Sequence, residues 1–134
     1  MLEMVVLHRA DNVLAAISDK ESLELFRYIA SKNGDSDRLR TETNLTRKQY
    51  YSRLSRMTKA GLVRRKNGKH SLTAFGKVVY DAETTIEKAI NNYWKLKAID
   101  SLELSDELPK EERIKLIDNL LDNNDIKEIL YSKV

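Results

Sequence analysis

The stretch "LTRKQYYSRLSRMTKAGLVRRKNGKHSLTAFGK", from Leu45 to Lys77, decides the fold of this chain. It contains ten Lys or Arg residues and no Asp or Glu. Apolar residues also recur along it, at Tyr50, Leu54 and Met57, with the spacings of four and three that one face of a helix requires. The stretch is therefore either a solvated helix face that happens to be basic, or a surface that fits an acidic partner.

Local signals divide the stretch into a helix and a hairpin. Thr46 and Gln49 form a capping box, in which each side chain can bond the backbone of the other. Gly61 suits the left-handed residue that ends a helix, so we predict a helix over residues 46–60. Asn67-Gly68 is the strongest short signal for a β-hairpin, and the segment around it predicts a hairpin over residues 62–72.

Further helices are predicted on both sides of this stretch. A short helix from Ser36 to about Thr43 ends at Asn44, which can adopt the left-handed conformation. Before it, Ser18 and Glu21 predict a capping box and a helix that reaches about Ser31. Residues 1–17 suggest a short strand ("MLEMVVL") and a short helix ("NVLAAI"). After the hairpin, apolar spacing predicts one long helix over about residues 74–99 and then one or two helices in the tail. The fold class is mainly α with a small β-hairpin, an α+β arrangement.

Two phrases in the stretch point to a family. "MTKAGLV" (57–63) fits the L/M-x-x-x-G-L-V/I pattern and "HSLTAFG" (70–76) fits Y/H-x-L-T-x-x-G. With these phrases the segment from about Asn12 to Ile99 resembles archaeal winged helix-turn-helix transcriptional regulators of the ArsR/MarR-like kind. The resemblance implies a winged-helix domain over residues 1–99, with helix 74–99 used for homodimerisation. It does not cover the acidic extension at 100–134, which we expect to pack on the same domain or on a partner subunit.

The resemblance also implies a function, namely sequence-specific binding of double-stranded DNA by a transcription regulator. Helix 46–60 would enter the major groove and hairpin 62–72 would contact the backbone or the minor groove. Arg and Lys suit guanine and Gln suits adenine, so the outward residues near the start of the helix are the candidates for base edges: Arg47, Lys48, Gln49, Tyr51 and Ser52. The backbone candidates are the other basic residues: Arg38, Arg40, Arg56, Lys59, Arg64, Arg65, Lys66 and Lys69. His70 and Asn67 could join them. The dimer-interface candidates are Ile86, Ala89, Ile90, Tyr93, Trp94 and Leu96.

The charge distribution supports a polyanionic partner independently. The net charge of the 134-residue chain is only +3, but residues 38–77 hold twelve Lys or Arg against one Glu, a local charge of +11. Residues 100–134 hold ten acids and five bases, a local charge of −5. Such a concentrated field attracts polyanions. Two alternatives stay open, a non-specific architectural DNA-binding protein and a winged-helix module that binds an acidic protein.

Other functions receive little support from the sequence. There is no cysteine and there are only two histidines, His8 and His70, which lie far apart in the sequence. No glycine-rich phosphate-binding motif occurs. We therefore expect no enzyme activity, no cofactor and no metal site. No apolar run approaches the roughly 20 residues that span a bilayer, so we expect a cytoplasmic protein. The expected binding to DNA would make it nucleoid-associated.

Overall fold

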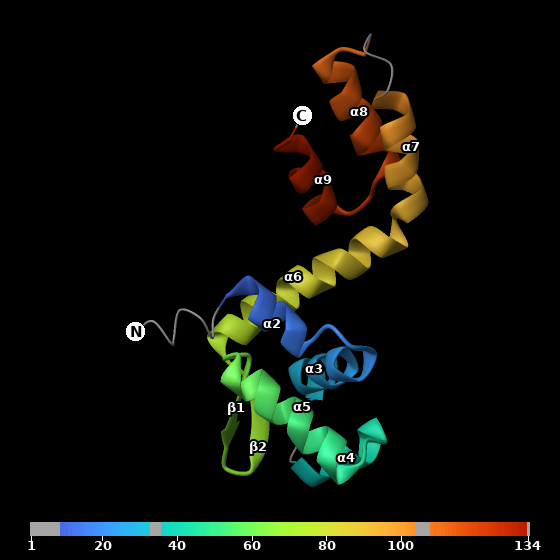
Figure 1. Ribbon diagram of the computed structural model, residues 1–134. Coiled ribbons are helices and arrows are strands. Elements are labelled where there is room, and N and C mark those ends of the chain that lie inside the picture. Colours follow the sequence, from blue (N-terminus) through green and yellow to red (C-terminus); the bar gives the residue numbers. More distant parts are fainter. Residues whose placement is uncertain (1–8, 33–35, 104–107, 134) are drawn as a thin grey trace. The chain divides into compact units, whose positions relative to one another are not determined.

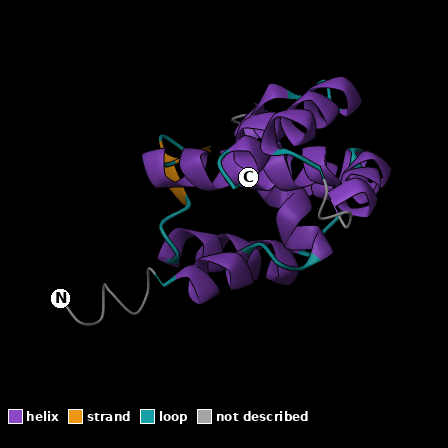
Figure 2. Cartoon of the chain, turned by 90° about the horizontal axis from the view of Figure 1, so that it is seen from above, coloured by secondary structure: helices purple, strands orange, loops and turns teal. Residues whose placement is uncertain are grey.

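The computed structural model describes residues 9–32, 36–103 and 108–133, and the side chains of residues 32, 36–39 and 103 are not described. The suggested strand in "MLEMVVL" therefore lies outside the described residues. Helices predominate, and two short strands form one antiparallel ribbon (Figure 2). This agrees with the predicted α+β class.

The chain divides into two units, residues 1–81 and 82–134. The division falls within one helix, whereas the sequence suggested a boundary after Ile99. Each unit has its own apolar core.

Among its described residues, the first unit contains four helices and the hairpin (Figure 1). The helices are α2 (Ala10–Ala16), α3 (Lys20–Lys32), α4 (Ser36–Thr43) and α5 (Arg47–Lys59). The strands are β1 (Val63–Lys66) and β2 (Lys69–Leu72), and the first residues of α6 (Ala74–Asn91) complete the unit. Helix α5 packs against α2 and against β1, and α3 packs against α4 and β2.

The first core gathers one face of each of these elements. Phe26 and Ile29 of α3 meet the predicted stripe of α5, namely Tyr50, Leu54 and Met57, and all of these side chains are buried. Val13 and Ala16 of α2 close the core from another side. The inward stripe of α5 is therefore confirmed.

The start of α3 differs from its prediction. Asp19, rather than Ser18, caps the helix, because its Oδ2 accepts a hydrogen bond from the Ser22 N–H at 3.2 Å. The Ser18 hydroxyl instead donates to the Ala15 carbonyl at 3.2 Å, at the end of α2. Helix α3 consequently begins one residue later than a Ser18 cap would place it.

The part of the second unit that the structure describes consists of the rest of α6 and three further helices. These are α7 (Tyr93–Glu103), α8 (Lys110–Leu120) and α9 (Asn124–Tyr131). Their core contains Ile99, Ile117, Leu121 and Ile126. Pro109 precedes α8, and the Asn123 side chain caps α9 by accepting from the Ile126 N–H at 3.1 Å. The acidic extension thus packs on α7.

The prediction of a single long helix over residues 74–99 is wrong, because the helix is interrupted at Asn92 (Figure 1). The Asn92 side chain donates to the Lys88 carbonyl at 2.8 Å, so it competes for the oxygen that the Asn92 N–H would normally use alone. The Asn92 N–H is shared between the carbonyls of Lys88 and Ala89, at 3.1 Å each. Local side-chain bonds of this kind compete with regular helix geometry, which explains the bend between α6 and α7.

Candidate nucleic-acid interface

The turn that leads into α5 fixes where its first residues point. Asn44 has a φ of 55° and ends α4 in the left-handed conformation. The predicted capping box is present, since the Thr46 hydroxyl accepts from the Gln49 N–H at 3.2 Å and Gln49 Oε1 accepts from the Thr46 N–H at 3.0 Å. The first turn of α5 therefore starts at a defined residue, and the backbone N–H groups of Thr46 and Gln49 are occupied.

The capping box also changes what Gln49 can do. Recognition of adenine by glutamine uses both the amide oxygen and the amide nitrogen. In this structure the amide oxygen already accepts the Thr46 N–H. Gln49 is exposed, but its side chain is held against the cap, so it is a weaker candidate for a base contact than Arg47 or Lys48.

The outward face of α5 is polar and solvent-exposed. The five base-edge candidates are exposed, and so are Arg56 and Lys59 further along the helix. Tyr51 is 48% exposed and its ring packs edge-on against buried Tyr50, with 5.2 Å between the ring centroids. Tyr51 therefore places an exposed aromatic ring with a polar hydroxyl tip on this face, in contact with the buried core residue Tyr50.

One basic residue of α5 has a structural contact instead. Arg53 Nε and Nη2 both lie 3.2 Å from Asp19 Oδ2, and Nη2 lies 3.9 Å from Glu21. Burial alone would raise the pKa of Asp19, but hydrogen bonds from Ser22 and Arg53 and the Arg53 charge outweigh it, so the pKa is lowered. This contact joins α5 to the start of α3. No local pattern in the sequence indicated it, because the two residues are 34 positions apart.

A compact junction connects α5 to the hairpin and to α6. Gly61, with a φ of 81°, follows the helix, and the Leu62 N–H bonds the Met57 carbonyl while the Gly61 N–H bonds the Thr58 carbonyl. These are the two bonds of a Schellman motif. Across the hairpin, the Thr73 N–H donates to the Leu62 carbonyl at 3.1 Å. The junction therefore holds both ends of the hairpin together.

Thr73 and Gly76 complete this junction. The Thr73 hydroxyl donates to the carbonyls of Gly61 and Leu62, and it accepts the Gly76 N–H at 2.9 Å as the cap of α6. A Cβ on Gly76 would lie 2.0 Å from the Leu62 carbonyl oxygen. The residues of "AGLV" and "LTAFG" therefore bring two backbone segments into contact, at Leu62 and Gly76.

The hairpin turns as predicted at Asn67-Gly68, whose φ angles of 56° and 75° are both positive. Two such residues define a type I′ turn, whose twist suits a hairpin. The register pairs Arg64 with Ser71, Arg65 with His70 and Lys66 with Lys69.

This register divides the basic residues between two faces, since directly paired residues share a face of the ribbon. Arg64, Lys66 and Lys69 lie on the outer face, whereas Arg65 lies on the face of His70 and Leu72. All four basic residues are exposed. From the sequence, all four residues were equivalent candidates for contacts with the DNA backbone. The register places Arg65 on a different face of the ribbon from the other three.

His70 is buried, with 6% of its surface exposed. The suggestion that His70 contacts a nucleic acid is therefore wrong. It alternates with exposed Lys69 and points toward the core with Leu72. Burial, and then the positive charge of Arg65, lower the pKa of His70.

The remaining basic candidates lie on α4. Arg40 is partly exposed, and the Arg38 side chain lies outside the described residues.

Across the described parts of the chain, no three His, Asp or Glu side chains gather closely enough to hold a metal ion. Nor does any described helix combine the length and apolarity needed to cross a membrane.

The dimer-interface candidates separate into two groups. Trp94 is 79% exposed and Ile90 is 60% exposed, and Ile86 and Tyr93 are also exposed. Tyr93 packs edge-on against Trp94, with 5.3 Å between the ring centroids. By contrast, Ala89 and Leu96 pack against the second core. Among these candidates, only the first four are therefore exposed apolar side chains.

Compared with protein-family models, curated proteins and solved structures, the chain matches none.

Proposed function

We propose that the chain is a sequence-specific, double-stranded DNA-binding transcription regulator of the winged helix-turn-helix kind. In this proposal α4 and α5 are the helix-turn-helix and β1 and β2 are the wing. The observation that carries the proposal is the exposed polar row of α5 beside a basic hairpin, within a segment whose local charge is +11. Phosphate contacts dominate the affinity of proteins for DNA, while side chains in the groove provide specificity.

The positions of the exposed residues suggest that some of them contact base edges and others contact phosphates. Arg47 and Lys48 lie in the first turn of α5, with Tyr51 and Ser52 one turn later, so these four would read base edges in the major groove. Arg56 and Lys59 lie toward the end of α5 and would contact phosphates. On the wing, the outer-face residues Arg64, Lys66 and Lys69 would follow the DNA backbone, and Arg65 would lie to the side.

Selection of bound fragments from a random duplex pool, followed by titration at several salt concentrations, tests this proposal. With about six phosphate contacts, log K should fall against log salt concentration with a slope of about −5. Lys69→Gln should weaken binding to all sequences and reduce that slope by about 1, whereas Arg47→Ala should change the preferred sequence. Lys110→Gln, an exposed cation on α8, is the matched control and should change neither quantity.

The outcomes distinguish the alternatives. Absence of binding at low salt would refute DNA binding and favour an acidic protein partner. Equal affinity for selected and scrambled duplexes would favour an architectural protein. If Lys69→Gln and Lys110→Gln changed the DNA affinity equally, the wing would not be part of the DNA interface.

We also propose that the regulator is a homodimer that pairs through Ile86, Ile90, Tyr93 and Trp94. Clustered exposed apolar side chains that include Trp and Tyr are typical of the centre of protein interfaces. Ile90→Glu should convert the dimer to a monomer in sedimentation velocity experiments. Ile129→Glu changes another exposed isoleucine, on α9, and should leave the dimer intact. A wild-type monomer at micromolar concentration would refute this part of the proposal.

A further inference from the structure

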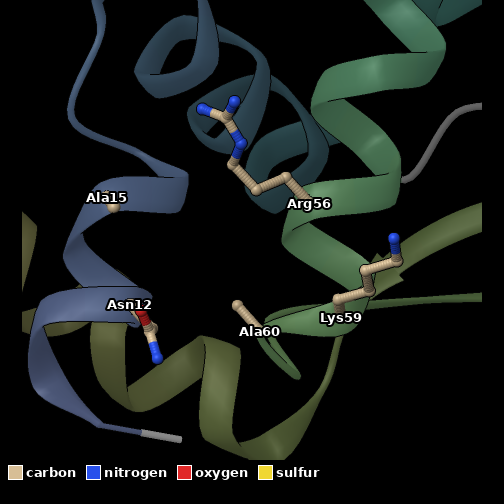
Figure 3. A pocket seen from close by; sticks show the side chains of 5 residues that line it. All are labelled: Asn12, Ala15, Arg56, Lys59 and Ala60. Carbon is tan, nitrogen blue, oxygen red and sulfur yellow. The ribbon is translucent and has the colours of Figure 1, made fainter. Parts of the chain in front are cut away.

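Pockets of similar volume occur in the two units, and the one in the first unit is part of the proposed DNA-binding surface. It lies between α2 and α5 and has a volume of about 270 Å³. Arg56 and Lys59 of α5 both line it (Figure 3). Because both residues are assigned to DNA phosphates, this pocket is not a separate site.

The pocket in the second unit, also of about 270 Å³, lies beside α7 and α8, which pack against each other (Figure 1). Its volume is just below the roughly 300–1,000 Å³ of pockets that enclose drug-sized ligands, so it suits one or two side chains of a larger partner. None of its lining residues is a candidate for DNA contact. The lining comes from the end of α7, from a residue just before α8 and from α8 itself: Leu102, Leu108, Glu112, Lys115, Leu116 and Asn119.

Three leucines make this pocket apolar, and the core of the second unit does not contain them. Leu102 is 45% exposed, and Leu108 and Leu116 are partly exposed. None of the three belongs to the buried core of the second unit or is among the side chains that pack against it. Apolar side chains that gather at the surface outside a core are typical of binding surfaces. The three leucines therefore form an apolar surface that a partner can cover.

The segment that lines the pocket is negatively charged. Residues 100–122, which include the whole lining, hold eight Asp or Glu and three Lys or Arg, a local charge of −5. Residues 123–134 hold two acids and two bases and are balanced. The negative charge of the acidic extension thus belongs to the segment that forms the pocket and not to α9. Electrostatic complementarity at interfaces therefore favours a cationic partner.

Two charged side chains of the lining are paired only weakly. Lys115 Nζ lies 3.7 Å from Glu112 Oε1, and both side chains are exposed. An exposed ion pair of this kind contributes at most about 1 kcal/mol. Glu112 can therefore exchange Lys115 for a cation of a partner at little cost.

We propose that this surface binds a cationic amphipathic helix of another protein. Aliphatic side chains of that helix would cover Leu102, Leu108 and Leu116, and its Lys or Arg residues would lie beside Glu112. Amphipathic helices commonly lay their apolar face into hydrophobic grooves, with anchors at i, i+3 or i+4, and i+7. An anionic helix would meet the local charge of −5, and a uniformly polar helix would leave the leucines uncovered. The proposal goes beyond DNA binding, because it gives the second unit a protein partner.

A synthetic helix of about 15 residues tests the proposal, with leucines spaced i, i+4 and i+7, lysines on its polar face and alanine elsewhere. Its binding to the full-length protein is measured without DNA, by following the amide signals of the protein in NMR titrations. We expect saturable shifts centred on Leu102, Leu116 and Asn119. A peptide with alanines in place of the leucines should bind about tenfold more weakly, and so should a peptide with glutamates in place of the lysines.

Matched substitutions locate the surface on the protein. Leu102 on α7 and Ile129 on α9 are exposed to nearly the same degree, 45% and 43%. Leu102→Glu should weaken binding about tenfold, whereas Ile129→Glu should leave the affinity unchanged. Two charge changes within the lining should act in opposite directions: Glu112→Gln should weaken binding of the lysine peptide about threefold, and Lys115→Gln should strengthen it by about the same factor.

Three results would overturn the proposal. The first is equal affinity of the leucine and alanine peptides, and the second is equal affinity of the Leu102→Glu and Ile129→Glu proteins for the leucine peptide. The third is dissociation of the wild-type dimer by Leu102→Glu but not by Ile90→Glu in sedimentation velocity experiments, which would make a second copy of the chain the occupant. The titrations contain no DNA, so their outcome does not depend on whether the first unit binds a duplex.

Discussion

Replacement of Gly76 by alanine would place a methyl carbon 2.0 Å from the carbonyl oxygen of Leu62. Real Cβ contacts are essentially never shorter than 3.0 Å, so one of the two backbones must move by about 1 Å. Gly76 lies in regular helix, and alanine is the better helix former by about 1 kcal/mol. Any destabilisation therefore comes from the contact with Leu62.

The cost of this movement follows from the bonds that meet at the junction. The Leu62 carbonyl accepts from the Thr73 N–H at 3.1 Å and from its hydroxyl at 3.3 Å, and a shift of about 1 Å would break both. Each such bond contributes about 1 kcal/mol, and the steric strain adds about 1–3 kcal/mol. After the gain in helix propensity, we expect the free energy of unfolding to fall by about 2–4 kcal/mol.

Urea denaturation followed through the amide NMR signals of α5 measures this change in the unit that contains the junction. Gly68→Ala is the matched control, because Gly68 has a φ of 75° but no atom lies within 4 Å of the point that a Cβ would occupy there. That substitution should cost only about 1–2 kcal/mol, from the left-handed conformation alone. A Gly76→Ala protein as stable as the wild type would refute the proposed role of the close contact.

Two further predictions concern titratable groups. Asp19→Asn keeps a capping oxygen but removes the charge that faces Arg53, so it should lower the free energy of unfolding by about 0.5–1 kcal/mol at pH 7. Because the pKa of Asp19 is lowered, this stabilisation is present above its ordinary pKa of 3.8 and is lost as the pH falls through the folded-state value. Urea midpoints that do not differ between the two proteins at pH 7 would contradict it, and Asp11→Asn, in an exposed ion pair, is the control. The pKa of His70 is also lowered, so the stability contributed by its neutral form is present above pH 6.5 and is lost as the pH falls through the folded-state pKa. Wild-type urea midpoints should therefore fall between pH 7.5 and pH 5, and His70→Gln should flatten this part of the profile; an unchanged slope would exclude His70 as its cause.

The sequence predicted best the features that depend on a few neighbouring residues. Thr46 with Gln49 and Gly61 located both ends of α5, because caps act over three or four positions. Asn67-Gly68 located the hairpin turn for the same reason. The exposed row of α5 then followed from its buried stripe.

Features that depend on distant contacts or on competition between side chains were not predictable in this way. The apolar spacing continues through Asn92, so it does not reveal the side-chain bond to Lys88 that interrupts the helix. Ser18 and Asp19 are both good helix caps, so the sequence does not show which of them is used. In the structure Asp19 caps α3, and the same residue also contacts Arg53. His70 was placed wrongly because only the register with Arg65 shows which face of the ribbon it occupies.

The junction between Leu62 and Thr73 also bears on the order in which the chain folds. Its hydrogen bonds link residues only 11 or 12 positions apart, and the loop between them contains a turn that favours hairpin closure. Hairpins of this kind form in about 1–10 μs, much faster than contacts between distant segments. The contact of Arg53 with Asp19, by comparison, requires closure of a loop about three times longer. We therefore expect α5, the hairpin and the start of α6 to form an early folding nucleus, onto which α2 and α3 dock afterwards.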